Sequence, residues 1–184
     1  MKENEFNDMM DGVARAEADA QFRLAVLYTY GDGVPENYEK AVELYTKAAS
    51  QVHVEAQYNL GICYHYGYGA EVDLKAAFEL YKTSASQGYA KGKSLVGLFY
   101  YQGLHVQQNY AEAVKWFLEA EEQGDMAAEY WLGVCCAKGH GVLQDEEEAM
   151  KRYRKSAAQG YPYAKKALED MLNNRSRSGG GEPN

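Results

Sequence analysis

Apolar and small residues recur along the chain with a period of 36 residues, with no insertion or deletion through four units. A fixed period of this length is typical of a stacked array of repeats, in which each unit buries its apolar face against its neighbours. Three of the positions in register are occupied by Leu24, Leu60, Val96, Leu132 and Leu168, by Ala20, Ala56, Gly92, Ala128 and Ala164, and by Tyr45, Tyr81, Phe117 and Tyr153.

Each unit contains two segments with the apolar spacing of a helix. Residues 55–67 carry apolar or small side chains at i, i+4, i+5 and i+8, and residues 73–87 repeat this kind of spacing. We call the first segment of a unit helix A and the second helix B. Small residues at recurring positions allow two helix axes to approach closely. The pattern predicts an all-α chain built from helix pairs.

Glycines follow helix A in every unit. The first lies where helix A must end, a position that favours the left-handed conformation open to glycine, and is occupied by Gly31, Gly67, Gly103 and Gly139. A second glycine, at positions 33, 69 and 141, is expected to let the loop reverse; His105 replaces it in the third unit and predicts a slightly altered turn. A phosphate-binding loop would need a preceding strand, and the pattern shows none. The glycines therefore indicate turns.

Helix B is predicted to begin after an N-cap residue, because Asn and Asp side chains accept a hydrogen bond from the exposed backbone N–H groups of a first turn. Glu112 and Glu148 follow two of these caps at the spacing of a capping box. The four N-cap residues are Asn37, Asp73, Asn109 and Asp145.

These positions resemble the Sel-one-like repeat (SLR) family, a relative of the tetratricopeptide repeats. Unit two reads AQYNLGICYHYGYGAEVDLKAAFELYKTSASQG and unit four reads AEYWLGVCCAKGHGVLQDEEEAMKRYRKSAAQG. The resemblance implies a right-handed α/α superhelical solenoid of antiparallel helix pairs. Some secreted members of the family carry paired cysteines within each unit, and this chain lacks those pairs.

The register gives the expected domain organisation. Residues 1–15 form an N-terminal arm or partial cap, residues 16–174 form the solenoid, and residues 175–184 form a flexible tail. Within the solenoid, the repeats span 16–51, 52–87, 88–123 and 124–159, and residues 160–174 form a capping helix.

Composition narrows the classes of function. The net charge of −8 and the pI near 5.1 argue against binding to a phosphate backbone, so we expect no nucleic-acid partner. No apolar run is long enough to span a membrane. Three cysteines cannot form an even disulfide framework, so we expect reduced thiols and a cytoplasmic protein, unless an export signal has been trimmed from the chain.

The sequence offers little support for catalysis. The four histidines show neither HExxH spacing nor a Cys-x2-Cys companion, so we expect no catalytic residue, no metal site and no cofactor. Cys63 and His65 lie two residues apart on a predicted helix and therefore point to different faces, which makes them a poor nucleophile–base pair.

The resemblance implies that the A helices line a concave face. The register relative to the leucine position then selects candidate partner-binding residues, many of them tyrosines, whose amphipathic rings are favoured at interfaces. Tyr30, Tyr66 and Tyr101 are the favoured groove residues. Positions two before and two after the leucine can instead pack against the adjacent A helix, so a core role stays open there. The full set is Phe22, Val26, Tyr30, Tyr58, Ile62, His65, Tyr66, Leu98, Tyr101, Tyr130, Val134 and Lys138.

We therefore hypothesise a non-catalytic scaffold that binds a protein or peptide segment along the concave face. Two alternatives stay open, a hydrolase-like enzyme and a self-associating structural module. We expect a monomer, with self-association as the competing possibility.

Overall fold

The structure, a computed structural model, describes the backbone of residues 3–178 and the side chains of residues 6–174. These residues form helices and loops without a β-strand. The helices are α1 (Glu3–Ala14), α2 (Ala18–Tyr30), α3 (Tyr38–Ser50), α4 (Val54–Tyr66), α5 (Leu74–Ser86), α6 (Ala90–Gln102), α7 (Tyr110–Glu121), α8 (Met126–Lys138), α9 (Glu146–Ala158) and α10 (Pro162–Ser178).

The helices repeat at the predicted interval. From α2 onward the even-numbered helices are the A helices, and each begins 36 residues after the last; the B helices α3, α5, α7 and α9 do the same. The prediction of an all-α chain of helix pairs, in the class of α/α solenoids, is confirmed. None of the described helices is long and apolar enough to cross a membrane.

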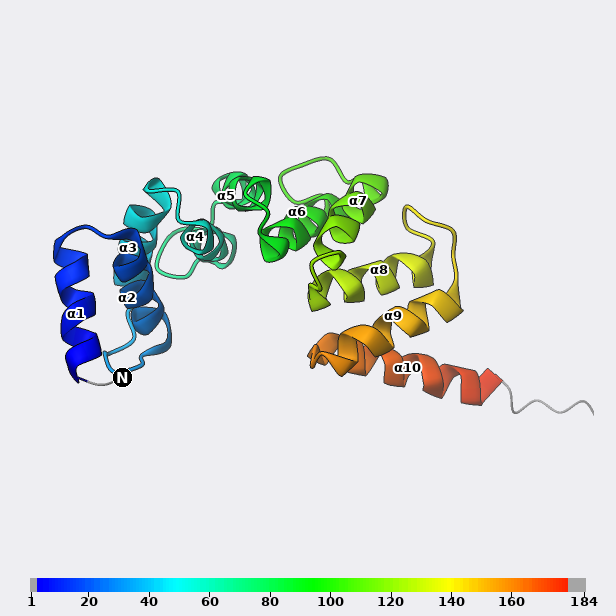
Figure 1. The fold of residues 1–184 in the computed structure, drawn as a ribbon. Helices are drawn as coiled ribbons and strands as arrows, with labels where there is room; N and C mark the ends of the chain where they lie inside the picture. The colour runs from blue at the N-terminus through cyan, green and yellow to red at the C-terminus, as the bar shows by residue number, and fades with distance from the viewer. Residues whose placement is uncertain (1–2, 179–184) are drawn as a thin grey trace, which may run out of the picture. The chain divides into compact units, whose positions relative to one another are not determined.

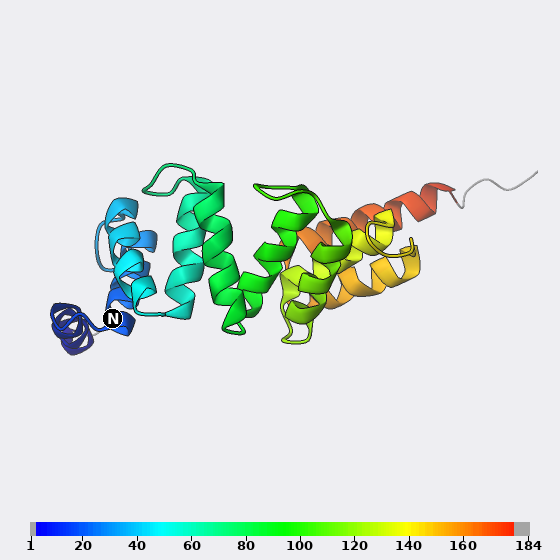
Figure 2. The same cartoon turned by 90° about the horizontal axis from the view of Figure 1, so that it is seen from above.

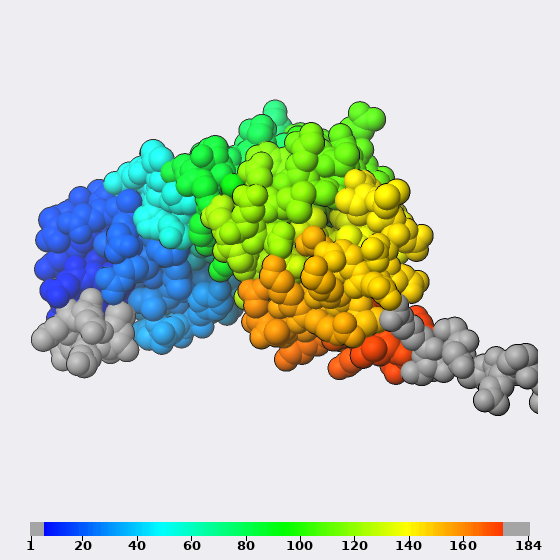
Figure 3. Space-filling view, turned by 45° about the vertical axis from the view of Figure 1, so that its right-hand side comes forward, coloured from blue at the N-terminus to red at the C-terminus, as the bar shows by residue number. Residues whose placement is uncertain are grey.

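The chain divides into two compact units, Met1–Gly92 and Lys93–Asn184, with the boundary inside α6. In the first unit α2 packs against α3 and α4 against α5, while α3 also contacts α4 and α1 packs on α2 (Figure 1). In the second unit α8 contacts both α7 and α9, and α10 packs on α9 (Figure 2). The space-filling view shows α9 (yellow to orange) forming part of the second unit's surface (Figure 3).

The loops between helices A and B close in the same way in all four repeats. The first glycine adopts positive φ, for example 76° at Gly67, and the N-cap side chains accept from the first turn of helix B as predicted. Each N-cap N–H donates to a carbonyl of helix A at 2.9 Å, as Asp73 does to Tyr64. The predicted capping box is therefore wrong, because this N–H is already satisfied. Glu112 pairs with Lys115 instead, and Glu148 pairs with Lys151 and Arg152.

The second glycine has a further role in the second and fourth repeats that the sequence did not reveal. A Cβ at Gly69 would overlap the carbonyl group of Tyr38 at the start of α3, and a Cβ at Gly141 would lie 2.6 Å from the Tyr110 oxygen at the start of α7. The loop therefore rests on the first turn of the preceding B helix. Gly33, in the first repeat, has nothing within 4 Å. His105 keeps positive φ at 60°, so the backbone conformation survives the replacement of glycine.

Each unit has its own core. In the first, small and aromatic side chains of α2, α3 and α4 pack around Tyr45, and in the second those of α7, α8 and α9 pack around Phe117. Buried glutamines of helix A accept from the glutamine that ends helix B, Gln21 from Gln51 at 2.9 Å and Gln57 from Gln87 at 2.6 Å. The recurring glutamine thus ties the two helices of a repeat together.

The ends of the chain differ in detail from the expected boundaries. Helix α1 occupies most of the predicted N-terminal arm, and its Met9 is buried against the first core. Helix α10 begins near the start of the predicted capping helix and continues to Ser178, four residues into the predicted tail, because Arg175–Ser178 contain no glycine or proline to stop it. Residues 179–184 of that tail lie outside the described residues.

Candidate protein-binding surface

One register position of the A helices, six residues after the leucine, is exposed in all four repeats. In the first unit it holds two tyrosines: Tyr30 is 75% exposed and Tyr66 is 52% exposed. In the second unit it holds Gln102 and Lys138, which are also exposed. Because large aromatic rings are costly to leave in water, the two tyrosines mark a candidate binding surface on the first unit.

A cavity of about 200 Å³ lies beside Tyr30. We call it the tyrosine cavity. It forms where the ends of α2 and α4 meet the start of α3 and the loop after α4, and it is lined by Thr29, Tyr30, Tyr38, Tyr45, Asn59, Ile62, Cys63 and Tyr68. Two of the predicted site residues, Tyr30 and Ile62, thus meet at one cavity, together with loop and B-helix residues that the sequence analysis did not select.

Hydrogen bonds within the cavity wall fix which polar atoms it presents. The Thr29 hydroxyl donates to the Ala25 carbonyl at 2.9 Å and lies 3.1 Å from the Tyr45 hydroxyl. Because a threonine hydroxyl has one proton, Tyr45 must be the donor in that pair. The Asn59 Nδ2 atom donates to the Glu55 carbonyl at 2.8 Å, which leaves Oδ1 and one N–H of the amide for other partners. The wall therefore presents oxygen acceptors at Asn59 and Tyr45, beside the hydroxyls of Tyr30, Tyr38 and Tyr68, which can donate or accept.

Stacked rings run along one side of the tyrosine cavity. The Tyr38 and Tyr68 centroids lie 5.4 Å apart, those of Tyr68 and Tyr66 lie 5.7 Å apart, and those of Tyr66 and His65 lie 4.3 Å apart, all with interplanar angles of 26° or less. Offset stacking of this kind holds rings in place. The exposed Tyr66 is thus the continuation of a column that begins at the cavity.

The prediction for Tyr101 is wrong. Tyr101 sits five residues after the leucine position. In the first two repeats this position holds Thr29 and His65, and each lies beside the tyrosine hydroxyl of its own helix B rather than facing outward. It is buried in the second core, its hydroxyl lies 3.0 Å from His140 Nδ1, and its ring is 5.1 Å from that of Trp131. The next position on α6, occupied by Gln102, is exposed.

Val134 is also buried in the second core, so the core alternative left open for it holds and a groove role does not. The remaining predicted residues at positions two before and two after the leucine are half-buried: Phe22, Val26, Tyr58, Ile62, Leu98 and Tyr130.

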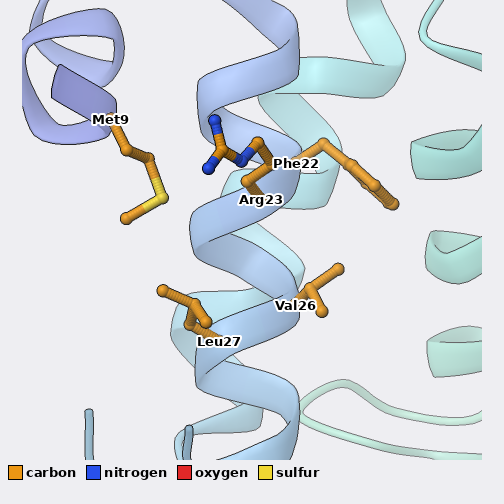
Figure 4. A pocket seen from close by; sticks show the side chains of 5 residues that line it. All are labelled: Met9, Phe22, Arg23, Val26 and Leu27. Carbon is orange, nitrogen blue, oxygen red and sulfur yellow. The ribbon is translucent and has the colours of Figure 1, made fainter. Parts of the chain in front are cut away.

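Two of these half-buried residues face a separate apolar cavity. Phe22 and Val26 help to line about 220 Å³ of space beside α2, together with Met9, Arg23 and Leu27. Figure 4 shows Met9 reaching from α1 toward the Leu27 side of α2, while Phe22 and Val26 project from the opposite side. Phe22 is also stacked on His53, with centroids 4.6 Å apart, so it contributes to packing between repeats.

Tyr130 lies in a second aromatic cluster. Its ring centroid is 5.3 Å from that of Tyr161 and 6.3 Å from that of Tyr163, which is 65% exposed on α10. The cluster has an exposed edge at Tyr163, which makes it a second candidate surface, on the second unit.

A charged cluster links α7, α8 and α9. Glu129 is 3% exposed, and its carboxylate lies 2.8 Å from Lys155 Nζ and 3.4 Å from Arg152 Nη1. Burial raises the pKa of Glu129, whereas the hydrogen bond from Lys155 lowers the pKa of Glu121. Glu129 occupies the register position of Gln21 and Gln57, so an ion pair here replaces the amide pair of the earlier repeats.

The three cysteines and His65 are held in packing contacts. Cys63, Cys135 and Cys136 are buried free thiols, and burial raises the pKa of Cys63 to about 11 and that of Cys135 to about 12. The His65 Nδ1 atom lies 3.4 Å from the Tyr81 hydroxyl. Among the described residues no three His, Cys, Asp or Glu side chains are grouped so as to hold a metal ion.

Four copies of one repeat model match the chain, over residues 18–53, 54–89, 90–125 and 127–161. The model is that of the Sel1 repeat. The chain belongs to the Sel1 repeat family. Proteins of this family are generally protein-interaction scaffolds and are typically non-catalytic. None of the curated proteins compared with the chain shows significant similarity to it.

Solved structures support the same assignment. A Sel1 repeat protein from Oxalobacter formigenes is 32% identical, with a TM-score of 0.84 over 89% of this chain and 65% of its own. A protective antigen of uropathogenic Escherichia coli strains with an SLR fold is 30% identical, with a TM-score of 0.80 over 92% of this chain and 36% of its own. This Sel1 repeat chain thus spans less than two thirds of either protein.

The Helicobacter pylori cysteine rich protein B shares the fold at a greater distance. It is 22% identical, with a TM-score of 0.54 over 72% of this chain and 98% of its own.

Proposed function

We propose that this Sel1 repeat chain is a non-catalytic interaction module that binds a segment of a partner protein at the tyrosine cavity and the adjoining exposed tyrosines. The observation that carries the proposal is the 75% exposed Tyr30 at the rim of a cavity walled by further tyrosines. Tyrosine is enriched among the residues that dominate binding energy, because its ring buries much area and its hydroxyl makes a directed hydrogen bond.

The size of the cavity favours a side chain of a protein as its occupant. Sites for drug-sized ligands usually enclose roughly 300–1,000 Å³. The tyrosine cavity, at about 200 Å³, is smaller, so it suits one side chain of a segment whose neighbouring residues contact Tyr66 and Tyr68 outside.

The proposal is tested by selecting binders from a random-peptide display library on the folded chain and measuring each against two variants. Tyr30→Ala should weaken binding about 30-fold, the loss of roughly 2 kcal/mol that defines a hot-spot residue. Tyr163→Ala is the matched control, because Tyr163 is comparably exposed but lies in the second unit. Equal affinity for both variants would refute the proposal.

The predicted monomeric state and cytoplasmic location remain predictions. Light scattering over a concentration series checks the first. If the chain associates through its tyrosines, its apparent molecular mass rises with concentration, and the Tyr30→Ala variant should not show that rise.

A further inference from the structure

We infer that the side chain bound in the tyrosine cavity is an arginine, so that the partner segment is a basic peptide. The inference rests on the proposed function and adds the chemical class of the partner. Three features of the described residues carry it: the polar atoms of the wall, the rings around them, and the charge of the unit.

The wall offers two oxygen acceptors to a bound group. The Asn59 amide and the Tyr45 hydroxyl each spend a donor on the protein itself, which leaves the Asn59 Oδ1 and Tyr45 Oη lone pairs for a bound group. An arginine guanidinium carries five N–H donors and no acceptor, so it matches such a wall.

The rings favour a cation. Tyr68 is stacked between Tyr38 and Tyr66, so the ring faces left to the cavity are those of Tyr30 and the outer face of Tyr38. The face of a tyrosine ring attracts a guanidinium within about 6 Å of its centroid. Arginine gains more than lysine from such a site, because its planar group stacks on a ring while its N–H groups still reach acceptors at the side.

The charge near the cavity has the complementary sign. None of the eight side chains that line it is acidic or basic, but the Glu36 carboxylate lies beside Tyr38 and, by charge repulsion above all, raises the pKa of the Tyr38 hydroxyl. Lys40, a nearby cation on α3, is placed over the Tyr28 ring, 5.1 Å from its centroid. Residues 1–92 carry 14 acidic residues against 8 lysines and arginines, which attracts basic segments over a longer range.

The test uses the peptides selected on the folded chain, resynthesised with each arginine in turn replaced by citrulline, its neutral isostere. We expect one citrulline in each peptide to weaken binding about 10-fold or more. Glu36→Gln should weaken the parent peptides about 5-fold at low salt, and added salt should shrink that difference. Glu39→Gln, an exposed glutamate three residues further along, is the control and should leave affinity within about 2-fold.

The outcomes separate the two proposals. Peptides that need Tyr30 but bind equally well with citrulline, or that are anchored by an acidic or apolar residue, overturn the arginine inference and leave the proposed function standing. Peptides that bind independently of Tyr30 overturn both. Because Tyr30 and Glu36 are exposed, their substitution leaves the core intact, and circular dichroism verifies the fold of each variant.

Discussion

Gly69 and Gly33 occupy the same position of successive repeats, yet alanine should affect them very differently. Both adopt positive φ, 69° and 77° respectively. Alanine in the left-handed conformation costs about 1 kcal/mol at either site. At Gly33 that is the whole effect, because an added Cβ meets nothing within 4 Å.

At Gly69 the added methyl group also meets the backbone of α3. It would overlap the Tyr38 carbonyl and lie 2.7 Å from the Glu39 nitrogen. Carbon contacts are optimal at about 3.5–4.0 Å, so the loop must withdraw by about 1 Å or more from a helix that cannot rotate away. Forced overpacking of this kind costs about 1–3 kcal/mol, which brings the expected loss in free energy of unfolding for Gly69→Ala to about 3 kcal/mol.

Urea unfolding monitored by far-ultraviolet circular dichroism measures both variants. A repeat array need not unfold in one step, so tryptophan fluorescence is recorded as well. Both tryptophans, Trp116 and Trp131, lie in the second unit, and Gly69→Ala should therefore change the dichroism transition more than the fluorescence transition. Equal losses of stability for Gly33→Ala and Gly69→Ala would show that the loop contact contributes nothing, and the reasoning from the structure would be wrong.

Three further predictions concern packing and charge. Gly92→Ala should destabilise by about 2 kcal/mol in thermal melts, because its Cβ would overlap Ser84 Oγ. Adding Ser84→Ala should restore most of this loss, because it recreates the alanine pairs at the equivalent positions, Ala48 with Ala56 and Ala120 with Ala128; no recovery would contradict the reasoning. Burial raises the pKa of Glu129 above its ordinary value of 4.5. The protonated carboxyl therefore contributes to stability at pH values below about 4.5, and that contribution is lost as the pH rises through the raised pKa. Glu129→Gln should therefore gain stability relative to the wild type as the pH rises from about 4.5 to about 7 in urea titrations; a constant difference would argue against it. Cys135, with its pKa raised to about 12 by burial, should react with a thiol reagent only as fast as the chain unfolds, and rapid labelling of the native protein would contradict the core assignment.

The sequence alone was enough for the helix pairs, their period and their ends. Helix length, the left-handed glycine at Gly67 and the N-cap at Asp73 depend on hydrogen bonds between residues a few positions apart, and such local terms are written in local sequence. The same holds for the outward direction of Tyr30 and Tyr66, because a helix of known register has only one face left once its core positions are assigned.

Tertiary structure decided what lies next to that face. Tyr101 differs from Tyr66 by one register position, or about 100° around a helix, and that step carries its ring from solvent into the second core. The stacking of Tyr68 on Tyr38 and the contact of Gly69 with the same residue join segments about 30 positions apart, and they depend on the offset between successive helix pairs. Periodicity fixes the direction in which a side chain leaves its own helix, but the distance and tilt of the neighbouring helix decide whether it meets water, a ring or a carbonyl, and those follow only from the packing of the whole repeat.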